Sequence, residues 1–179
     1  MSAHIIEKLA LSRGEKSTVL AYGAVIAMTA GITILIMSGV NGEGLIWADK
    51  SWFSQWVIFA GALSGGISLA LARGWMGLEG MLGLARAVIG GMAIAIMAAM
   101  IAGILIDPLL GVVYGPVLLV TEFLARPWLA IAWFVGSMAV HGLLLEARRE
   151  RELLAPPRAK QRAVAQLSRL SQENLYRRS

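Results

Sequence analysis

The sequence predicts an all-α integral membrane protein with four transmembrane helices, an outer re-entrant or interfacial segment, and a cytoplasmic basic helical tail. The first observation is composition: 58% of the 179 residues are hydrophobic and 15% are charged, against about 45–50% and about 25% in soluble domains. The second is that four apolar stretches reach the roughly 20 residues that a helix needs to cross a bilayer. The third is that basic residues concentrate on one side of these stretches. An ordinary soluble protein and a disordered chain are therefore both excluded.

The four predicted spans form a bundle over residues 18–145, after a polar N-terminal segment at 1–17. Arg86 is the only charged residue within them; it can reach the interface, where Glu79 is its expected partner. The apolar run after the N-terminal segment is too long for a typical signal peptide, so we interpret it as a retained signal-anchor. The predicted spans are residues 18–40, 53–72, 84–106 and 127–145.

Residues 107–126 contain a fifth apolar stretch that is shorter and carries Glu122. If the chain has four spans and a cytoplasmic N-terminus, 14 of the 16 Lys and Arg residues are cytoplasmic. If this stretch also spans, only 6 of them are. Because cytoplasmic loops carry an excess of Lys and Arg, the four-span topology is preferred. The segment is then predicted to lie on the outer side as a short helix, broken at Pro116 and packed against the bundle.

This topology places both termini in the cytoplasm. The tryptophans agree with it, because Trp47, Trp52, Trp56 and Trp128 fall near the outer interface and Trp75 near the inner one, the depths that indole rings prefer. Arginine outnumbers lysine by 12 to 4, which hints at a GC-rich bacterial source. We therefore expect a multi-pass protein of the bacterial cytoplasmic (inner) membrane.

Residues 146–179 form a basic tail that begins as a helical extension of the fourth span and is expected to break at Pro156-Pro157. Further along, apolar residues recur with weak helical spacing. One interpretation is an amphipathic helix on the anionic inner leaflet or on a partner subunit; the other is a solvated tail that only fixes topology. Nucleic acid is not an expected partner, because aromatic residues do not interleave with the basic ones. The candidate contact residues are Arg148, Arg149, Arg162 and Arg169.

Small residues recur every four positions in three of the predicted spans. Such a row lets a second helix approach closely, which matters in lipid because the hydrophobic effect drives little helix association there. The rows can serve packing within the chain, or one face can receive another subunit, a lipid, or a flat pigment or quinone. The candidate packing residues are Gly23, Ala27 and Gly31 in the first span, Gly61, Gly65 and Gly66 in the second, and Gly83, Ala87, Gly91, Ala95, Ala99 and Gly103 in the third.

Ionisable residues within the bilayer are few, and such residues mark functional sites by default. His141 is the only histidine inside a predicted span; it is either an interfacial structural residue, a proton relay, or an axial ligand to haem or bacteriochlorophyll. Asp107, Glu122 and Arg126 can cluster at the outer face as a polar site, or cap helix ends. The chain has no cysteine, and nothing in the sequence requires a metal or a cofactor.

No motif of an enzyme active site is present, so we expect no catalytic activity. The preferred hypothesis is a non-catalytic integral subunit that assembles or stabilises a respiratory, photosynthetic or transport complex. Its partners are membrane lipid and other integral subunits, or further copies of itself. The alternative is a small transporter or channel component, in which Thr29, Thr33, Ser64 or the outer polar group lines a wet path. A third hypothesis is a cofactor carrier that uses His141.

Overall fold

The computed structural model describes residues 12–41 and 51–154, and the regular secondary structure in these two stretches is entirely helical. Four of these helices are long and apolar enough to cross a membrane. The predicted fold class is confirmed to this extent. The helices are α2 (Arg13–Asn41), α3 (Trp52–Ala72), α4 (Gly80–Ile106), α5 (Gly111–Ala125) and α6 (Pro127–Leu154).

Several helices extend beyond the apolar stretches that predict them. α2 begins at Arg13, five residues before the apolar stretch, and α6 continues without a break to Leu154. A helix pairs its own backbone groups, so it can leave an apolar region and continue through a polar one. The predicted helix end at Pro156-Pro157 and the tail residues Arg162 and Arg169 lie outside the described residues.

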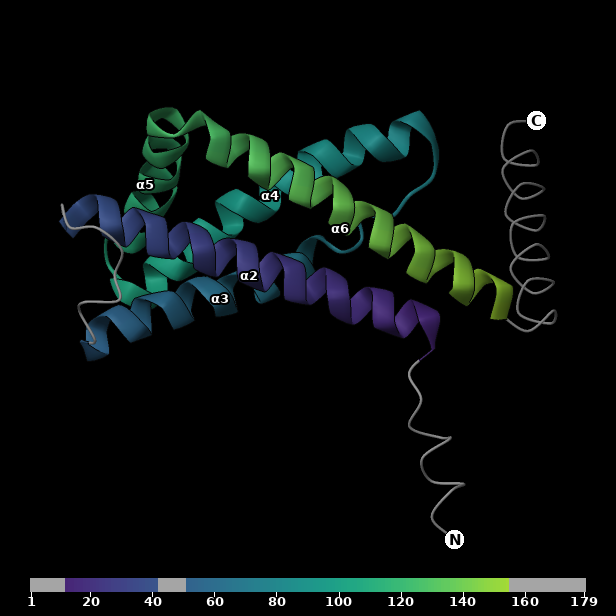
Figure 1. Cartoon of the computed structure of the whole chain (residues 1–179), viewed down its shortest axis with the longest axis horizontal. Coiled ribbons are helices and arrows are strands. Elements are labelled where there is room, and N and C mark those ends of the chain that lie inside the picture. The colour runs from purple at the N-terminus through teal and green to yellow at the C-terminus, as the bar shows by residue number, and fades with distance from the viewer. Residues whose placement is uncertain (1–11, 42–50, 155–179) are drawn as a thin grey trace, which may run out of the picture.

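The four long helices run along the length of the molecule, whereas α5 lies across them at one end (Figure 1). The start of α2, the connection 73–79 and the end of α6 meet at the opposite end, which we call the termini end (Figure 1). The end that holds α5 is called the α5 end. Both described chain ends therefore lie at the same end of the bundle.

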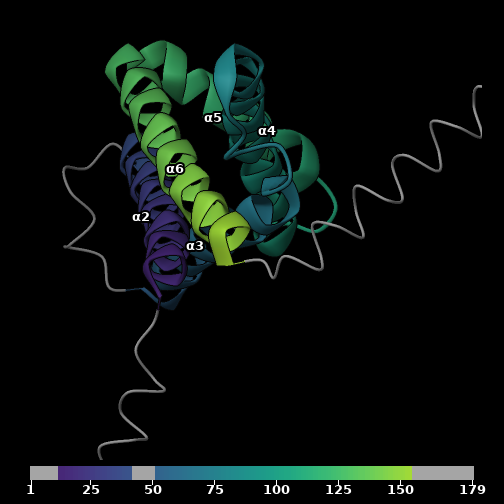
Figure 2. The same ribbon diagram turned by 90° about the vertical axis from the view of Figure 1, so that its right-hand side faces the viewer.

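α2 packs lengthwise against α6 and α3, and α4 packs against α3 and α5. Figure 2 shows α2 and α6 side by side. The core between the helices is built from Val25, Leu69, Ile94 and Val140, each at most 2% exposed. Large apolar side chains also cover the outer surface, beyond what a water-soluble monomer exposes. This surface is suited to lipid.

α5 follows a tight turn at Asp107. The Asp107 carboxylate accepts hydrogen bonds from the backbone N–H groups of Leu109, at 3.0 Å, and Leu110, at 3.2 Å. These bonds satisfy donors that precede a helix and would otherwise lack partners. Gly111 then brings the start of α5 onto the backbone of α4 at Gly103.

α5 is continuous through Pro116, so the predicted break there is wrong. A proline inside a helix removes one backbone hydrogen bond and crowds the carbonyl four residues earlier. Close packing against α4 offsets that cost here, because Gly115 lies directly against the Ala99 carbonyl and Gly111 against Gly103. Tertiary contacts of this kind supply most of the stability of short helices.

Candidate functional site

The small-residue row of α3 is occupied by α2. A Cβ atom added to Gly61 would overlap the Thr33 side chain, and one added to Gly65 would overlap Thr29. A Cβ atom added to Gly66 would lie 3.5 Å from Ile26 Cδ1, which is an ordinary van der Waals contact. The two threonines therefore fit into the surface of α3 where glycine leaves room.

The row of α4 is also used by the chain itself, and its members face several neighbours in turn. Gly83 lies against the Leu78 carbonyl in the preceding connection. A Cβ atom added to Gly91 would lie 3.0 Å from Ser137 Cβ on α6. Gly103 contacts Gly111 of α5. Ala87 and Ala95 are buried between these points. Because a four-residue repeat winds slowly around a helix, one row serves three different contacts.

The row of α2 is different, because no described helix packs onto Gly23 or Gly31. Gly23 and Ala27 are exposed, and a Cβ atom at Gly23 or Gly31 would meet nothing within 4 Å. Next to Gly31, an apolar groove of about 430 Å³ runs between α2 and α6, lined by residues that include Leu35, Leu129 and Ala132. We call Gly23, Ala27, Gly31 and this groove the open α2 face.

A second hollow lies toward the α5 end and is open to the outside of the bundle, because its lining includes the exposed side chains of Phe53 and Tyr114. It is a cavity of about 290 Å³, and its lining includes Thr29, Thr33, Ser64 and Asp107. These are four of the six residues that the transport hypothesis selects from the sequence. The structure thus gathers, around one cavity, polar residues that come from α2, α3 and the turn after α4.

The chemistry of this cavity is nevertheless apolar. Thr29 donates its hydroxyl to the Val25 carbonyl at 2.9 Å, Thr33 to the Thr29 carbonyl at 2.9 Å, and Ser64 to the Gly61 carbonyl at 2.8 Å. Each hydroxyl is therefore paired within its own helix. A buried water needs two to four polar partners, and this lining, with α4 alanines such as Ala98 and Ala102, offers few.

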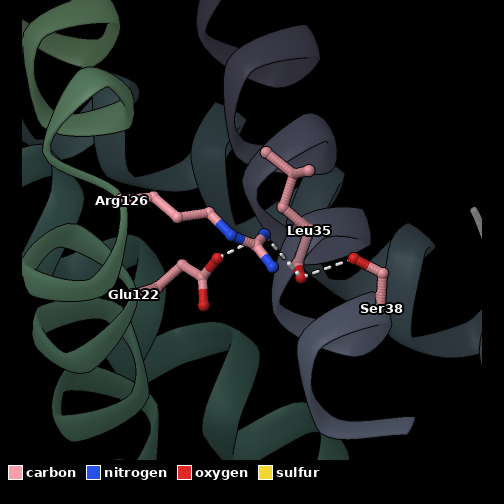
Figure 3. Close-up of polar contacts among 4 residues, drawn as sticks. All are labelled: Leu35, Ser38, Glu122 and Arg126. Carbon is pink, nitrogen blue, oxygen red and sulfur yellow. Dashed lines mark hydrogen bonds and ion pairs between the residues drawn. The ribbon is translucent and has the colours of Figure 1, made fainter. Parts of the chain in front are cut away.

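The three residues predicted to form a polar site at the outer face divide into two groups. Glu122 and Arg126 form an ion pair of 2.5 Å between Oε1 and Nη1. The same Arg126 nitrogen donates to the Leu35 carbonyl of α2 at 3.3 Å, and Ser38 donates to that carbonyl at 2.8 Å. Figure 3 shows these contacts, which tie the end of α5 to α2. Asp107 caps the turn before α5 instead.

His141 is buried and joins α6 to the connection 73–79. Its Nδ1 accepts a hydrogen bond of 3.0 Å from the backbone N–H of Gly77. Gly77 has φ of +72°, which glycine adopts without strain, and a Cβ atom there would meet the Leu144 backbone. No sequence pattern predicts this contact, because the two residues are 64 positions apart. Within the described stretches, no group of His, Asp and Glu residues could hold a metal ion.

The termini end carries the basic residues of α6. Arg148 donates from Nη2 to the carbonyls of Arg73 and Gly74, both at 3.2 Å. Arg149 Nε lies 2.6 Å from Glu79 Oε1. Glu79 therefore pairs with Arg149 of α6, and the partner expected from the sequence, Arg86, is wrong. Sequence reasoning also missed that Glu150 accepts from the Gly14 N–H.

Comparisons with family models, with curated proteins and with solved structures give no match. The chain is therefore characterised by its class alone: an all-helical protein with four helices fit to cross a membrane.

Proposed function

We propose that this protein is a non-catalytic integral subunit that assembles or stabilises a larger membrane protein complex. The observation that carries the proposal is the open α2 face. Of the three small-residue rows, those of α3 and α4 are filled by the chain's own helices, whereas Gly23 and Gly31 meet nothing.

The open α2 face has the chemistry that helix association in lipid requires. Small residues let two backbones approach closely, so that van der Waals contact stabilises the pair. Large apolar residues such as Val19, Leu20 and Ile26 are exposed beside the row, and side chains of a partner helix would fill the groove next to Gly31. A second integral subunit or a second copy of this chain meets these requirements equally.

The proposed setting is the cytoplasmic membrane of a bacterium, with both termini in the cytoplasm and α5 at the outer interface. Two features support this orientation. The termini end holds most of the described basic residues, and α5, with 15 residues, is shorter than the roughly 20 that a spanning helix needs.

The test is extraction of the full chain from its native membrane in a mild detergent, followed by native mass measurement and an absorption spectrum. We expect the chain to migrate in an assembly larger than one copy. Migration as a stable monomer would overturn the proposal. A visible spectrum without absorption bands would remove His141 as a ligand to haem or pigment.

A matched pair of variants locates the contact. Gly23→Leu blocks close approach to the open α2 face, and we expect it to reduce the assembled fraction about tenfold. Gly142→Leu introduces the same side chain at another exposed helical glycine with nothing within 4 Å, and assembly is expected to persist. Equal assembly in both variants would show that the partner binds elsewhere.

A transport role is the second candidate, because Thr29, Thr33, Ser64 and Asp107 line one cavity. It predicts ion or solute flux in vesicles that contain the purified chain, and loss of flux in Thr33→Val or Asp107→Asn. Flux no greater than in empty vesicles would eliminate this candidate.

A further inference from the structure

A polar pocket of about 340 Å³ lies at the termini end between α2, α3 and α6. Its polar lining consists of Thr18 and three arginines, Arg73, Arg148 and Arg151. Leu144 and Ala147 contribute its apolar side. We call this the arginine pocket.

Among the residues that the structure describes, no carboxylate lines the arginine pocket. Three acidic groups of this end are engaged elsewhere: Glu79 pairs with Arg149, Glu146 accepts from Ser17 at 3.2 Å, and Glu150 accepts from Gly14. Within the described residues, neither Arg73 nor Arg151 forms an ion pair. Three guanidinium groups around one space repel one another unless an anion lies between them.

Arg148 gives the pocket a fixed element. Its Nη2 donates to the carbonyls of both Arg73 and Gly74 at 3.2 Å, where α3 ends. Two such bonds hold the planar guanidinium in one orientation, so less conformational freedom is lost when an anion binds. Arg148 then contributes its positive charge and its remaining N–H groups, whereas the planar forks of Arg73 and Arg151 can each match two oxygens of a phosphate group.

The position of the pocket favours a lipid as the source of that phosphate. Leu144 belongs to the apolar part of α6, and Arg148 and Arg151 follow one and two turns later. The pocket therefore lies where the apolar and polar parts of the bundle meet, which is the depth of lipid headgroups. Large apolar side chains nearby, including Leu71 at 67% and Trp75 at 57%, are exposed and can lie along acyl chains.

We infer that the arginine pocket binds the phosphodiester headgroup of an anionic membrane lipid. Basic pockets between transmembrane helices at the cytoplasmic side recognise such headgroups. The inference goes beyond the proposed function and does not depend on it, because the pocket is formed within one chain and holds whether or not the open α2 face has a partner.

The test uses the purified full chain, stripped of lipid in an uncharged detergent. Phosphatidylglycerol, phosphatidylcholine and inorganic phosphate are added separately, and bound lipid is counted by native mass spectrometry beside the thermal unfolding midpoint. We expect phosphatidylglycerol to bind about tenfold more tightly than phosphatidylcholine and to raise the midpoint. Inorganic phosphate at the same concentration is expected to leave the midpoint unchanged; an equal rise would overturn the lipid assignment.

Two double variants distinguish lipid binding in the arginine pocket from a general attraction of the lipid to surface charge. Arg73→Gln with Arg151→Gln removes two exposed pocket arginines and is expected to weaken phosphatidylglycerol binding about tenfold. Arg13→Gln with Arg86→Gln removes the same charge from exposed residues outside the pocket, and less than a twofold change is expected. Equal weakening in both pairs, or no preference for phosphatidylglycerol in the unmodified chain, would overturn the inference. Should the pocket double variant fail to fold, Arg151→Gln alone is expected to weaken binding about threefold.

Discussion

Gly103 and Gly142 are both glycines within helices, yet their surroundings are opposite. A Cβ atom at Gly103 would overlap the Gly111 carbonyl of α5, whereas one at Gly142 would meet nothing within 4 Å. The sequence reveals the spacing of small residues, and Gly103 belongs to the longest row. Spacing does not reveal which rows face a neighbour, because the rotation of each helix about its axis is set by all its contacts together. For this reason the sequence could not show that the α2 row is open while the α4 row is filled.

The contrast predicts that alanine substitutions at these two glycines change the free energy of unfolding in opposite directions. Gly103→Ala forces α4 and α5 apart, and we expect it to lower the free energy of unfolding by about 2 kcal/mol, within the range for overpacked sites. Gly142→Ala adds a methyl group in open space and removes backbone freedom from the unfolded chain, so it is expected to raise stability by about 0.5 kcal/mol. Both are measured by unfolding the chain in mixed micelles of a mild and a denaturing detergent. A loss at Gly142 as large as that at Gly103 would mean that this surface is covered.

At the scale of elements, α5 is where sequence reasoning succeeded in part. Its shortness and Glu122 distinguished it from the four longer stretches, and the Glu122 and Arg126 spacing of four residues matches an ion pair along one helix. The continuity of the helix through Pro116 could not be predicted, since it depends on the glycine contacts with α4 that form only after folding. Whether α5 lies at an interface or spans the bilayer is a separate prediction.

Cysteine labelling tests that topology directly, because the natural chain contains no cysteine. Leu109→Cys and Leu124→Cys place thiols near the two ends of α5, where the side chains are 87% and 77% exposed. If α5 lies at the outer interface, both are labelled in intact cells by a maleimide that cannot cross the membrane. Leu153→Cys, near the end of α6, serves as the control and is expected to react only after the cells are opened. Labelling of Leu109→Cys and Leu124→Cys from opposite sides would establish α5 as a fifth span.

At the scale of the whole molecule, composition and charge distribution were sufficient to predict an all-helical bundle with four long apolar helices. The cavities required the structure. Thr29, Thr33 and Ser64 stand out in the sequence as polar residues in apolar stretches, but only the packing of five helices shows that they line one space. The arginine pocket combines residues of three helices in the same way, so neither could be assembled from local spacing.

The cavity at the α5 end yields a prediction that also distinguishes the two proposed functions. Burying apolar surface contributes roughly 25 cal/mol per Å², and Ala98, which is 4% exposed, lines this cavity of about 290 Å³. Ala98→Leu fills part of it, so we expect an increase of about 1 kcal/mol in the free energy of unfolding in detergent. Ala85→Leu, on the exposed surface of the same helix, is the matched control and is expected to change stability by less than about 0.5 kcal/mol.

The same variant is then placed in vesicles and in the native membrane. If the chain is a subunit held at the open α2 face, Ala98→Leu assembles normally, because Ala98 lines the cavity and not the groove of that face. If the cavity is a solute path, Ala98→Leu abolishes flux while Gly23→Leu leaves it intact. Destabilisation by Ala98→Leu of about 1–3 kcal/mol, the usual cost of overpacking, would show instead that side chains close this space in the folded protein, and a path for solute through it would then be excluded.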